Sequence, residues 1–144
     1  LFDIAANGNI YRSTDGGATF STRIGPTGIT ISIGTPSVKD ANTMWVTDST
    51  AAPSLYKSTT GGWTWDTPVA ITPSPGTIGQ MGIPKPDALL IGGTGFIVYS
   101  FDAGATFTRI DGPNAAELYR FAASPTFATD NTFFAADNGI LLHH

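Results

Sequence analysis

The chain has 144 residues, enough for one ordinary domain, and 41% of them are hydrophobic whereas only 12% are charged. The 17 glycines and 10 prolines favour short strands joined by tight turns over long surface helices. Seven basic residues stand against eleven acidic ones, and a net charge of -4 without a basic cluster argues against a nucleic-acid partner.

Several residue types are missing or stand only at the ends of the chain. Cysteine is absent, so no disulfide, thiolate zinc site or thiol nucleophile is expected. No apolar run approaches the roughly 20 residues of a membrane helix, so no membrane insertion is expected, and no signal-peptide pattern is present. The two histidines, His143 and His144, belong either to an affinity tag or to a natural last strand. Leu1 in place of methionine is expected from processing or from excision out of a longer parent.

The first predicted hairpin lies close to the N-terminus. Residues 2–6 and 9–12 have strand patterns, and Asn7-Gly8 between them is a preferred type I′ hairpin dipeptide. The next eight residues, 13–20, read Ser-Thr-Asp-Gly-Gly-Ala-Thr-Phe. Their glycines and their Asp predict a tight turn after the second strand.

The same order of strands and turn returns in the middle of the chain. Apolar stretches at 29–33, 42–46 and 54–57 precede the sequence Ser-Thr-Thr-Gly-Gly-Trp-Thr-Trp at 58–65. This second turn begins 45 residues after the first one. The spacing therefore predicts a repeated structural unit.

A third copy follows, and then part of a fourth. Strand patterns at 78–83, 87–91 and 96–99 precede Ser-Phe-Asp-Ala-Gly-Ala-Thr-Phe at 100–107, which begins 42 residues after the second turn. Residues 107–110 form the predicted strand that leaves it. The fourth unit is predicted from apolar stretches at 118–123 and 131–135, a turn at Asp137-Asn138-Gly139 and a last strand near Leu142.

Four short strands in a period of 42 to 45 residues are typical of a β-propeller blade. The sequence thus predicts an all-β chain of four-stranded antiparallel meanders, a partial propeller of about three blades. The predicted units are an incomplete blade at 1–24, complete blades at 25–67 and 68–109, and an incomplete blade at 110–144. Propellers close with 4 to 8 blades, so the remaining blades of a parent propeller, or further copies of this chain, are expected partners.

The repeated turns resemble the Asp-box, also called the bacterial neuraminidase repeat, with the pattern Ser-x-Asp-x-Gly-x-Thr-(Trp/Phe). This family pattern is known from sialidases, endoglucanase propellers, sortilin-type receptors and many secreted bacterial proteins. Residues 124–133 also resemble an inter-blade segment of such secreted proteins. The middle copy departs from the pattern at Thr60. The matching positions are Ser13, Asp15, Gly17, Thr19 and Phe20, then Ser58, Thr60, Gly62, Thr64 and Trp65, then Ser100, Asp102, Gly104, Thr106 and Phe107.

The resemblance implies that these turns are structural. In the family the box joins the third and fourth strands of a blade, on the outer rim away from the ligand channel. The Asp in the bend accepts hydrogen bonds from neighbouring backbone N–H groups, and the glycine adopts a conformation closed to residues with a Cβ. The aromatic residue that ends each box is expected to pack between blades.

Groups for catalysis or metal binding are few. No internal histidine is present, which excludes a Ser-His-Asp triad and histidine metal ligands unless the terminal pair, His143 and His144, takes part. Paired carboxylates for glycosidic cleavage remain an alternative, but Asp40, Asp87 and Asp130 each precede a predicted second strand, where a turn role is simpler. No calcium-loop spacing is found, so neither a metal nor a cofactor is predicted.

Trp63 and Arg120 are the candidate ligand contacts. Trp63 occupies a variable position of the middle box and is predicted to point outward, where its indole either stacks on a sugar ring or covers its own sheet. Arg120 is the one arginine expected to face a central channel, with an ion pair to Glu117 as the alternative. The arginines expected on outer strands are Arg12, Arg23 and Arg109.

The sequence favours a non-catalytic propeller segment that acts as a scaffold or as a protein or glycan recognition module of a secreted or cell-surface bacterial protein. One alternative is a fragment of a glycoside hydrolase, of the sialidase or endoglucanase type, whose catalytic residues lie on other blades. A second alternative is a self-assembling unit whose end strands pair with the next copy.

Overall fold

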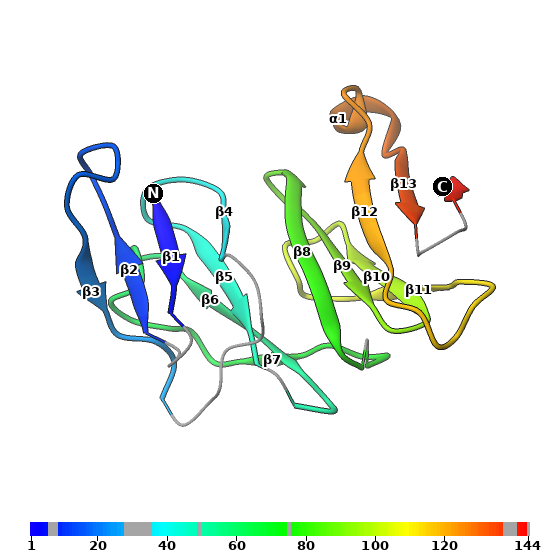
Figure 1. The fold of residues 1–144 in the computed structure, drawn as a ribbon, viewed down its shortest axis with the longest axis horizontal. Helices are drawn as coiled ribbons and strands as arrows, with labels where there is room; N and C mark the ends of the chain where they lie inside the picture. Colours follow the sequence, from blue (N-terminus) through cyan, green and yellow to red (C-terminus); the bar gives the residue numbers. More distant parts are fainter. Residues whose placement is uncertain (6–8, 28–35, 49, 75, 137–140, 144) are drawn as a thin grey trace.

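Four antiparallel sheets follow one another along the chain, from β1 to β14 (Figure 1). The structure, a computed structural model, describes residues 1–5, 9–27, 36–48, 50–74, 76–136 and 141–143. The predicted turn at Asn7-Gly8, the predicted strand at 29–33 and the predicted turn at 137–139 lie outside the described residues.

In each sheet the strands are paired in the order in which they follow along the chain, as in an up-and-down meander. The first sheet contains β1 (Phe2–Ile4), β2 (Ile10–Arg12) and β3 (Ser21–Arg23). The second sheet contains β4 (Ser37–Val38), β5 (Met44–Thr47), β6 (Ser54–Ser58) and β7 (Val69–Ala70). The third sheet contains β8 (Ile78–Lys85), β9 (Ala88–Gly93), β10 (Phe96–Ser100) and β11 (Thr108–Asp111). The fourth sheet contains β12 (Arg120–Ala123), β13 (Phe133–Ala136) and β14 (Leu141–His143).

The sheets differ from the predicted units in a few boundaries. β7 ends at Ala70 and β11 ends at Asp111, beyond the expected unit ends at 67 and 109. The reason is that the outer strand begins only after the turn is complete, at Val69 and Thr108. β4 was not predicted, because its two residues are too few to give a period-2 pattern, but it pairs with the start of β5.

Three apolar layers between the four sheets form the core. β9 lies between two other sheets, and both of its faces are buried. Leu89 and Ile91 pack toward the second sheet, while Ala88 and Leu90 pack toward the fourth. Side chains alternate between the two faces of a strand, so a strand between two sheets needs apolar residues at every position. The layer between the first two sheets is formed by Ile10, Met44 and Val46.

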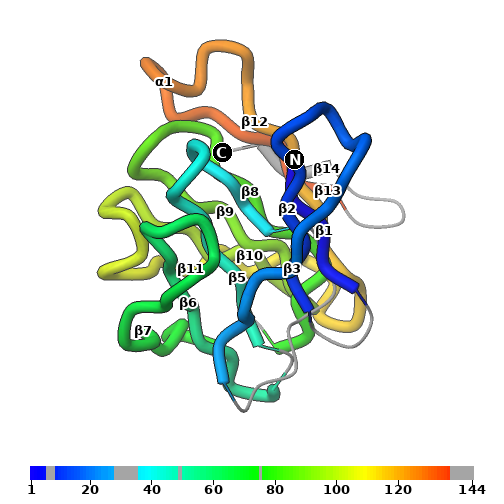
Figure 2. The backbone as a smooth tube through the Cα atoms, turned by 90° about the vertical axis from the view of Figure 1, so that its left-hand side faces the viewer, coloured from blue at the N-terminus to red at the C-terminus, as the bar shows by residue number. Residues whose placement is uncertain are grey.

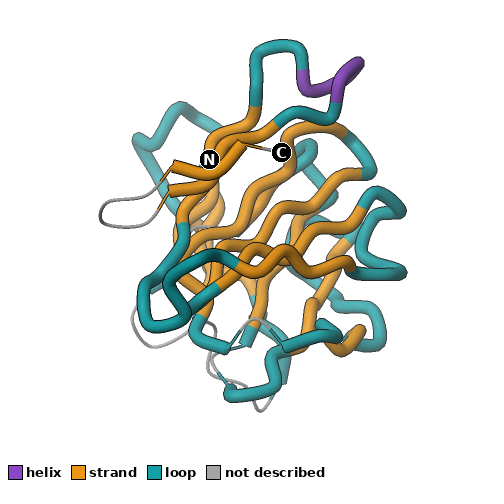
Figure 3. Tube along the Cα trace, turned by 90° about the vertical axis from the view of Figure 1, so that its right-hand side faces the viewer, coloured by secondary structure: helices purple, strands orange, loops and turns teal. Residues whose placement is uncertain are grey.

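The outer sheets bury only one face. Figure 2 views the molecule from the side of the first sheet, and Figure 3 from the side of the fourth, where α1 (Phe127–Asp130) projects beyond the strands. On β13, Phe133 is 2% exposed and packs toward the third sheet, whereas Phe134 is 38% exposed. The described residues include no helix that is long and apolar enough to cross a membrane.

The first two strands of the third sheet, β8 and β9, approach the fourth sheet closely at β12 and the residues just before it. The side-chain amide of Gln80 on β8 accepts a hydrogen bond from the Phe121 N–H at 2.9 Å and donates to the Phe121 carbonyl at 3.2 Å. The Tyr119 N–H donates to the Gly93 carbonyl at 3.1 Å. A Cβ on Gly92 would lie 2.2 Å from the Tyr119 carbonyl oxygen, so the backbones come together only because this residue has no side chain.

Gly92→Ala is therefore expected to lower the free energy of unfolding by about 2 kcal/mol or more, because backbone atoms of β9 or of the fourth sheet must shift. Urea unfolding followed by tryptophan fluorescence measures this change. The control is Gly82→Ala on β8, where the new Cβ would meet only the movable ring of Phe121, at 3.1 Å. Equal costs for the two variants would contradict the close backbone approach.

Candidate functional site

Each eight-residue turn leads into the outermost strand of its sheet. The turns at 13–20, 58–65 and 100–107 lie between β2 and β3, between β6 and β7, and between β10 and β11. In the complete sheets this is the connection of the third to the fourth strand, the place that the family resemblance implies.

A serine and an aspartate hold the first turn together. The Ser13 hydroxyl accepts the Gly17 N–H at 2.7 Å and donates to Asp15 at 2.7 Å. The Asp15 carboxylate then accepts the Thr19 N–H at 3.0 Å and the Thr19 hydroxyl at 2.5 Å. The third turn repeats these bonds with Ser100, Asp102, Gly104 and Thr106. The carboxylates are thus acceptors within their own turns.

The middle turn makes the same closure with a hydroxyl in place of the carboxylate. The Thr60 hydroxyl oxygen accepts the Thr64 N–H at 2.8 Å and lies 2.9 Å from the Thr64 hydroxyl. Its separation from the Ser58 hydroxyl is 3.4 Å, longer than the Ser-to-Asp bonds of the other turns. The single neutral hydroxyl oxygen of Thr60 thus takes the place of the two charged carboxylate oxygens of an aspartate. Its hydrogen bonds are weaker, so the middle turn is held more weakly than the other two.

The hydrogen bonds lower the pKa of both turn carboxyls from the ordinary value of 3.8. For Asp15 the largest cause is the Thr19 hydroxyl, followed by the Thr19 N–H, and the pKa falls far below its usual range. For Asp102 the same donors on Thr106 lower the pKa to about 2. The charged form is favoured because all of these groups donate to it.

The turn glycines bring each hairpin against the sheet before it. Gly62 and Gly104 have φ of +86° and +92°, a region that residues with a Cβ rarely adopt. A Cβ on Gly104 would lie 2.4 Å from the side chain of Leu55, and one on Gly62 would lie 3.2 Å from Arg23. The second turn thus packs on the first sheet and the third turn on the second.

The aromatic residues that end the turns do not all pack between sheets as predicted. Trp65 packs against the layer between the first and second sheets, and Phe107 against the layer between the second and third. Phe20 is 49% exposed, so the expectation of burial is wrong for it. The physical reason is that no described sheet lies before the first one to cover this ring.

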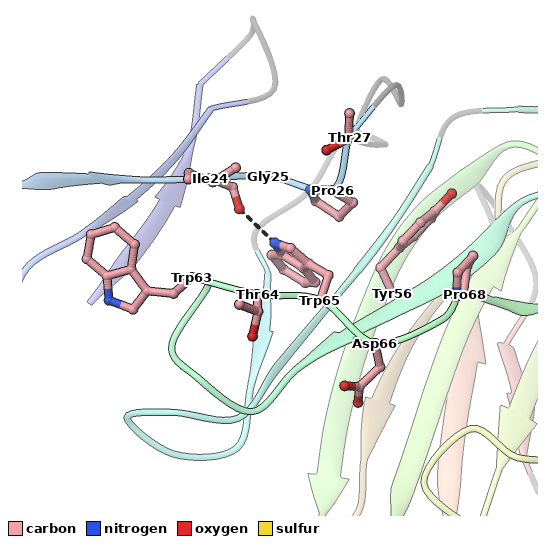
Figure 4. Close-up of a pocket in the computed structure, with 10 residues that line it drawn as sticks. All are labelled: Ile24, Gly25, Pro26, Thr27, Tyr56, Trp63, Thr64, Trp65, Asp66 and Pro68. Carbon is pink, nitrogen blue, oxygen red and sulfur yellow. Dashed lines mark hydrogen bonds between the residues drawn. The ribbon is translucent and has the colours of Figure 1, made fainter.

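A groove of about 410 Å³ lies where the second turn meets the end of the first sheet (Figure 4). The Trp65 indole N–H donates to the Ile24 carbonyl at 2.7 Å and so joins the turn to the segment that leaves β3. Tyr56 on β6 and Asp66 lie on the other side of Trp65 from Trp63 (Figure 4). The residues that line the groove are Ile24, Gly25, Pro26, Thr27, Tyr56, Trp63, Thr64, Trp65, Asp66 and Pro68.

Trp63 is outward-pointing, as predicted, and 53% exposed. Its inner face is covered by Arg23, whose guanidinium lies 4.3 Å from the indole ring. Arg23 is only 9% exposed and donates to the Ser21 hydroxyl and the Thr22 carbonyl. The indole therefore covers a residue of the preceding sheet, not its own, and keeps much of its surface open to solvent.

The sequence missed several residues of this groove. Tyr56 is half-buried against the layer between the first and second sheets, and its hydroxyl donates to Asp48 at 3.3 Å. Arg23 was expected on an outer strand, which it is, but its stacking on Trp63 was not foreseen. The alternation of β6, which places Tyr56 opposite to Leu55, is the signal that could have identified Tyr56.

The other candidate residues are not part of the groove. Arg120 is exposed at the start of β12, in another sheet. Asp40 accepts the N–H groups of Asn42 and Thr43, both at 2.8 Å, and Asp130 accepts the N–H of Thr132 at 2.8 Å. These two carboxylates thus act in turns. Within the described ranges, no three His, Asp or Glu residues come together as a metal site.

Thr60→Asp is expected to raise the melting temperature by about 2 to 4 °C, because a carboxylate accepts the hydrogen bonds of Ser58 and Thr64 more strongly than a hydroxyl does. Thermal unfolding at pH 7 measures the change. Thr60→Ala serves as the opposite control and is expected to lower the melting temperature. A lower melting temperature for Thr60→Asp would refute the turn role.

The lowered pKa of Asp102 predicts a pH dependence of stability. A carboxyl whose pKa is depressed by folding stabilises the protein above the unfolded-state value of 3.8, and this contribution is lost as the pH falls through about 2. Asp102→Asn is therefore expected to be less stable than the parent at pH 7, with a difference that narrows below pH 4. Urea midpoints between pH 7 and pH 2 measure it. A difference that stays constant would contradict the lowered pKa.

Comparison with known proteins bears on the fold. No protein-family model and no curated protein matches the chain. A solved structure of YCF48 bound to D1 peptide is similar, with a TM-score of 0.67 at 15% identity over 99% of this chain and 48% of that one. YCF48 from Cyanidioschyzon merolae gives a TM-score of 0.60 at the same identity and coverage. The chain thus spans about half the length of these β-propeller proteins, and the prediction of an all-β partial propeller of about three blades is confirmed.

Proposed function

We propose that the chain is a non-catalytic β-propeller segment that serves as a scaffold and as a protein-recognition module, with the groove beside Trp63 as its contact to a peptide of the partner. The observation that carries this proposal is a groove of about 410 Å³ that presents exposed tryptophan surface at the junction of two sheets. Large, rigid aromatic side chains are the residues that most often dominate protein interfaces.

Two further observations support a binding role without catalysis. The carboxylates of Asp15 and Asp102 accept hydrogen bonds from their own turns, so we assign them a structural role and not that of catalytic acids. One of the similar propellers is described as bound to a peptide. We place the protein outside the cell or at a bacterial cell surface on the strength of the Asp-box resemblance, and we keep glycans as the second class of ligand that the test must distinguish.

Trp63→Ala is expected to weaken peptide binding at least about tenfold, since truncation of a hot-spot aromatic residue typically costs about 2 kcal/mol or more. An array of random dodecamer peptides probed with the labelled parent chain selects the binders, whose dissociation constants are then measured by fluorescence anisotropy. A glycan array is probed in parallel.

The matched control is Phe20→Ala, because Phe20 is exposed to a similar extent, lies at an equivalent hairpin and is not part of the groove lining. Trp63→Phe is expected to keep most of the affinity, which separates ring contact from misfolding. Equal binding by the parent and Trp63→Ala would refute the groove as the peptide site. Binding to glycans and to no peptide would replace protein recognition by sugar recognition.

A further inference from the structure

Each sheet has a front face, turned toward the preceding sheet, and a rear face, turned toward the next one. In the first sheet the front face is the one turned away from the second sheet. Strand pairing and the order of residues in the turns make five front-face positions equivalent in the first three sheets. They are Leu1, Asp3, Tyr11, Gly17 and Phe20 in the first sheet, Met44, Val46, Tyr56, Gly62 and Trp65 in the second, and Leu89, Ile91, Val98, Gly104 and Phe107 in the third.

The front face of the first sheet is uncovered, although its residues are of the kind that docks on a preceding sheet. Leu1 is 69% exposed, whereas the equivalent Met44 and Leu89 are buried. Gly17 has a φ of +99°, and a Cβ on it would come within 4 Å of Leu1 and of no other described residue. Phe20, which ends the turn, is also exposed. This face thus has the apolar residues and the glycine turn of a docking face, and they remain open to solvent.

The rear face of the fourth sheet is open as well, and its described strands carry apolar side chains there. Phe134 on β13 lies opposite Ala122 on β12, and both are exposed. In the third sheet Leu90 lies opposite Gly82 in the same way, and Leu90 is fully buried in the layer toward the fourth sheet. Phe134 thus stands at a position that a following sheet covers.

Arg120 lies where the third sheet has a side chain that holds the next sheet. Arg120 pairs with Ala136 as Gln80 pairs with Gly92. The Gln80 amide bonds to both the N–H and the carbonyl of Phe121, on the first strand of the following sheet. Arg120 is exposed and forms no ion pair with another described residue. It therefore stands at the position from which a side chain reaches the inner strands of a following sheet.

Asp3 is the charged member of the front face, at a position where the next two sheets have Val46 and Ile91. It is exposed, lies on β1, the innermost described strand of its sheet, and forms no ion pair within the described part of the chain. A carboxylate that is covered by another sheet needs a cation beside it. An arginine meets this need, because its long side chain carries a planar group that binds a carboxylate through two hydrogen bonds. Arg120 and Asp3 are therefore complementary in charge and in their place near the inner strands.

We propose that the rear face of the fourth sheet docks on the front face of the first sheet in a second copy of this chain, with Arg120 of one copy bound to Asp3 of the other. Phe134 and Ala122 then cover the apolar residues beside Asp3. Consecutive sheets already pack front to rear within the chain, so the same kind of contact continues from one copy to the next. The inference goes beyond the proposed function and does not depend on the groove.

Two copies are sufficient for a closed ring. Each copy offers one front face and one rear face, and a head-to-tail contact made twice closes when the sheets of each copy turn through half a circle. The chain aligns with 48% of the YCF48 propeller at a TM-score of 0.67, so its sheets cover about half of such a ring. A dimer of this kind leaves neither docking face open, in contrast to an open row of copies.

The test begins with the mass of the full chain in solution, measured by sedimentation velocity from micromolar to millimolar concentrations. As the concentration rises, we expect the monomer to be replaced by one species of twice its mass, without larger species. A chain that stays monomeric throughout would overturn the proposal. A continuing series of larger species would overturn the closed ring.

Asp3→Arg and Arg120→Asp are each expected to weaken this association at least about tenfold, because two like charges then face each other. An equimolar mixture of the two variants is expected to regain most of the association, since both contacts of a mixed pair again join opposite charges. A variant that had only misfolded is not restored by mixing. If the mixture fails to associate while each variant keeps a cooperative melting transition, the contact between Arg120 and Asp3 is wrong.

Phe134→Ser tests the apolar part of the contact and is expected to weaken association about tenfold. Phe101→Ser is the matched control, because Phe101 is equally exposed, at 38%, but packs beside Tyr99 and Phe127 and lies on neither docking face. It is expected to leave the association unchanged. Equal effects of the two substitutions would contradict docking through the rear face of the fourth sheet.

Discussion

The bond between a serine hydroxyl and the backbone N–H of a glycine four residues later is the contact on which the arrangement of the sheets depends. It is made at 2.7 to 2.9 Å in all three turns. The bond closes each hairpin tightly enough to return the chain as an outer strand, and it fixes the glycine at a positive φ. Because this glycine has no side chain, the hairpin can then lie directly on the preceding sheet, as Gly104 does on Leu55.

The third and fourth sheets also approach each other closely, but through contacts at their inner strands instead of a turn. There the missing side chains of Gly79 and Gly92 make room for Leu118 and for the Tyr119 backbone, and the amide of Gln80 extends the hydrogen bonding of β8 to the next sheet. Hairpin contacts thus hold the second sheet on the first and the third on the second, and the inner-strand glycine contacts hold the fourth sheet on the third. The apolar layers between them are then buried on both sides, which is the main source of stability.

The sequence predicted the repeated features and missed the contacts between sheets. The period of the turns predicted the four units, and the alternation on strands such as β13 follows from local pattern alone. The burial of Phe20 was predicted from the family resemblance and is wrong, because burial depends on a neighbouring sheet. The stacking of Arg23 on Trp63 joins residues of different sheets, and no local pattern encodes that contact.

The middle turn differs from its neighbours in ways that act together. Where the third turn has Ala105 and Phe107, the middle turn has Trp63 and Trp65, and the indole N–H of Trp65 can reach the Ile24 carbonyl, which a phenylalanine cannot do. This bond holds the segment after β3 as one wall of the groove. The middle turn also has Thr60 in place of an aspartate, so the hydrogen bonds that close this turn involve no charged group. The middle repeat thus differs from the other two by an exposed indole and by a hydrogen bond that ties its turn to the preceding sheet.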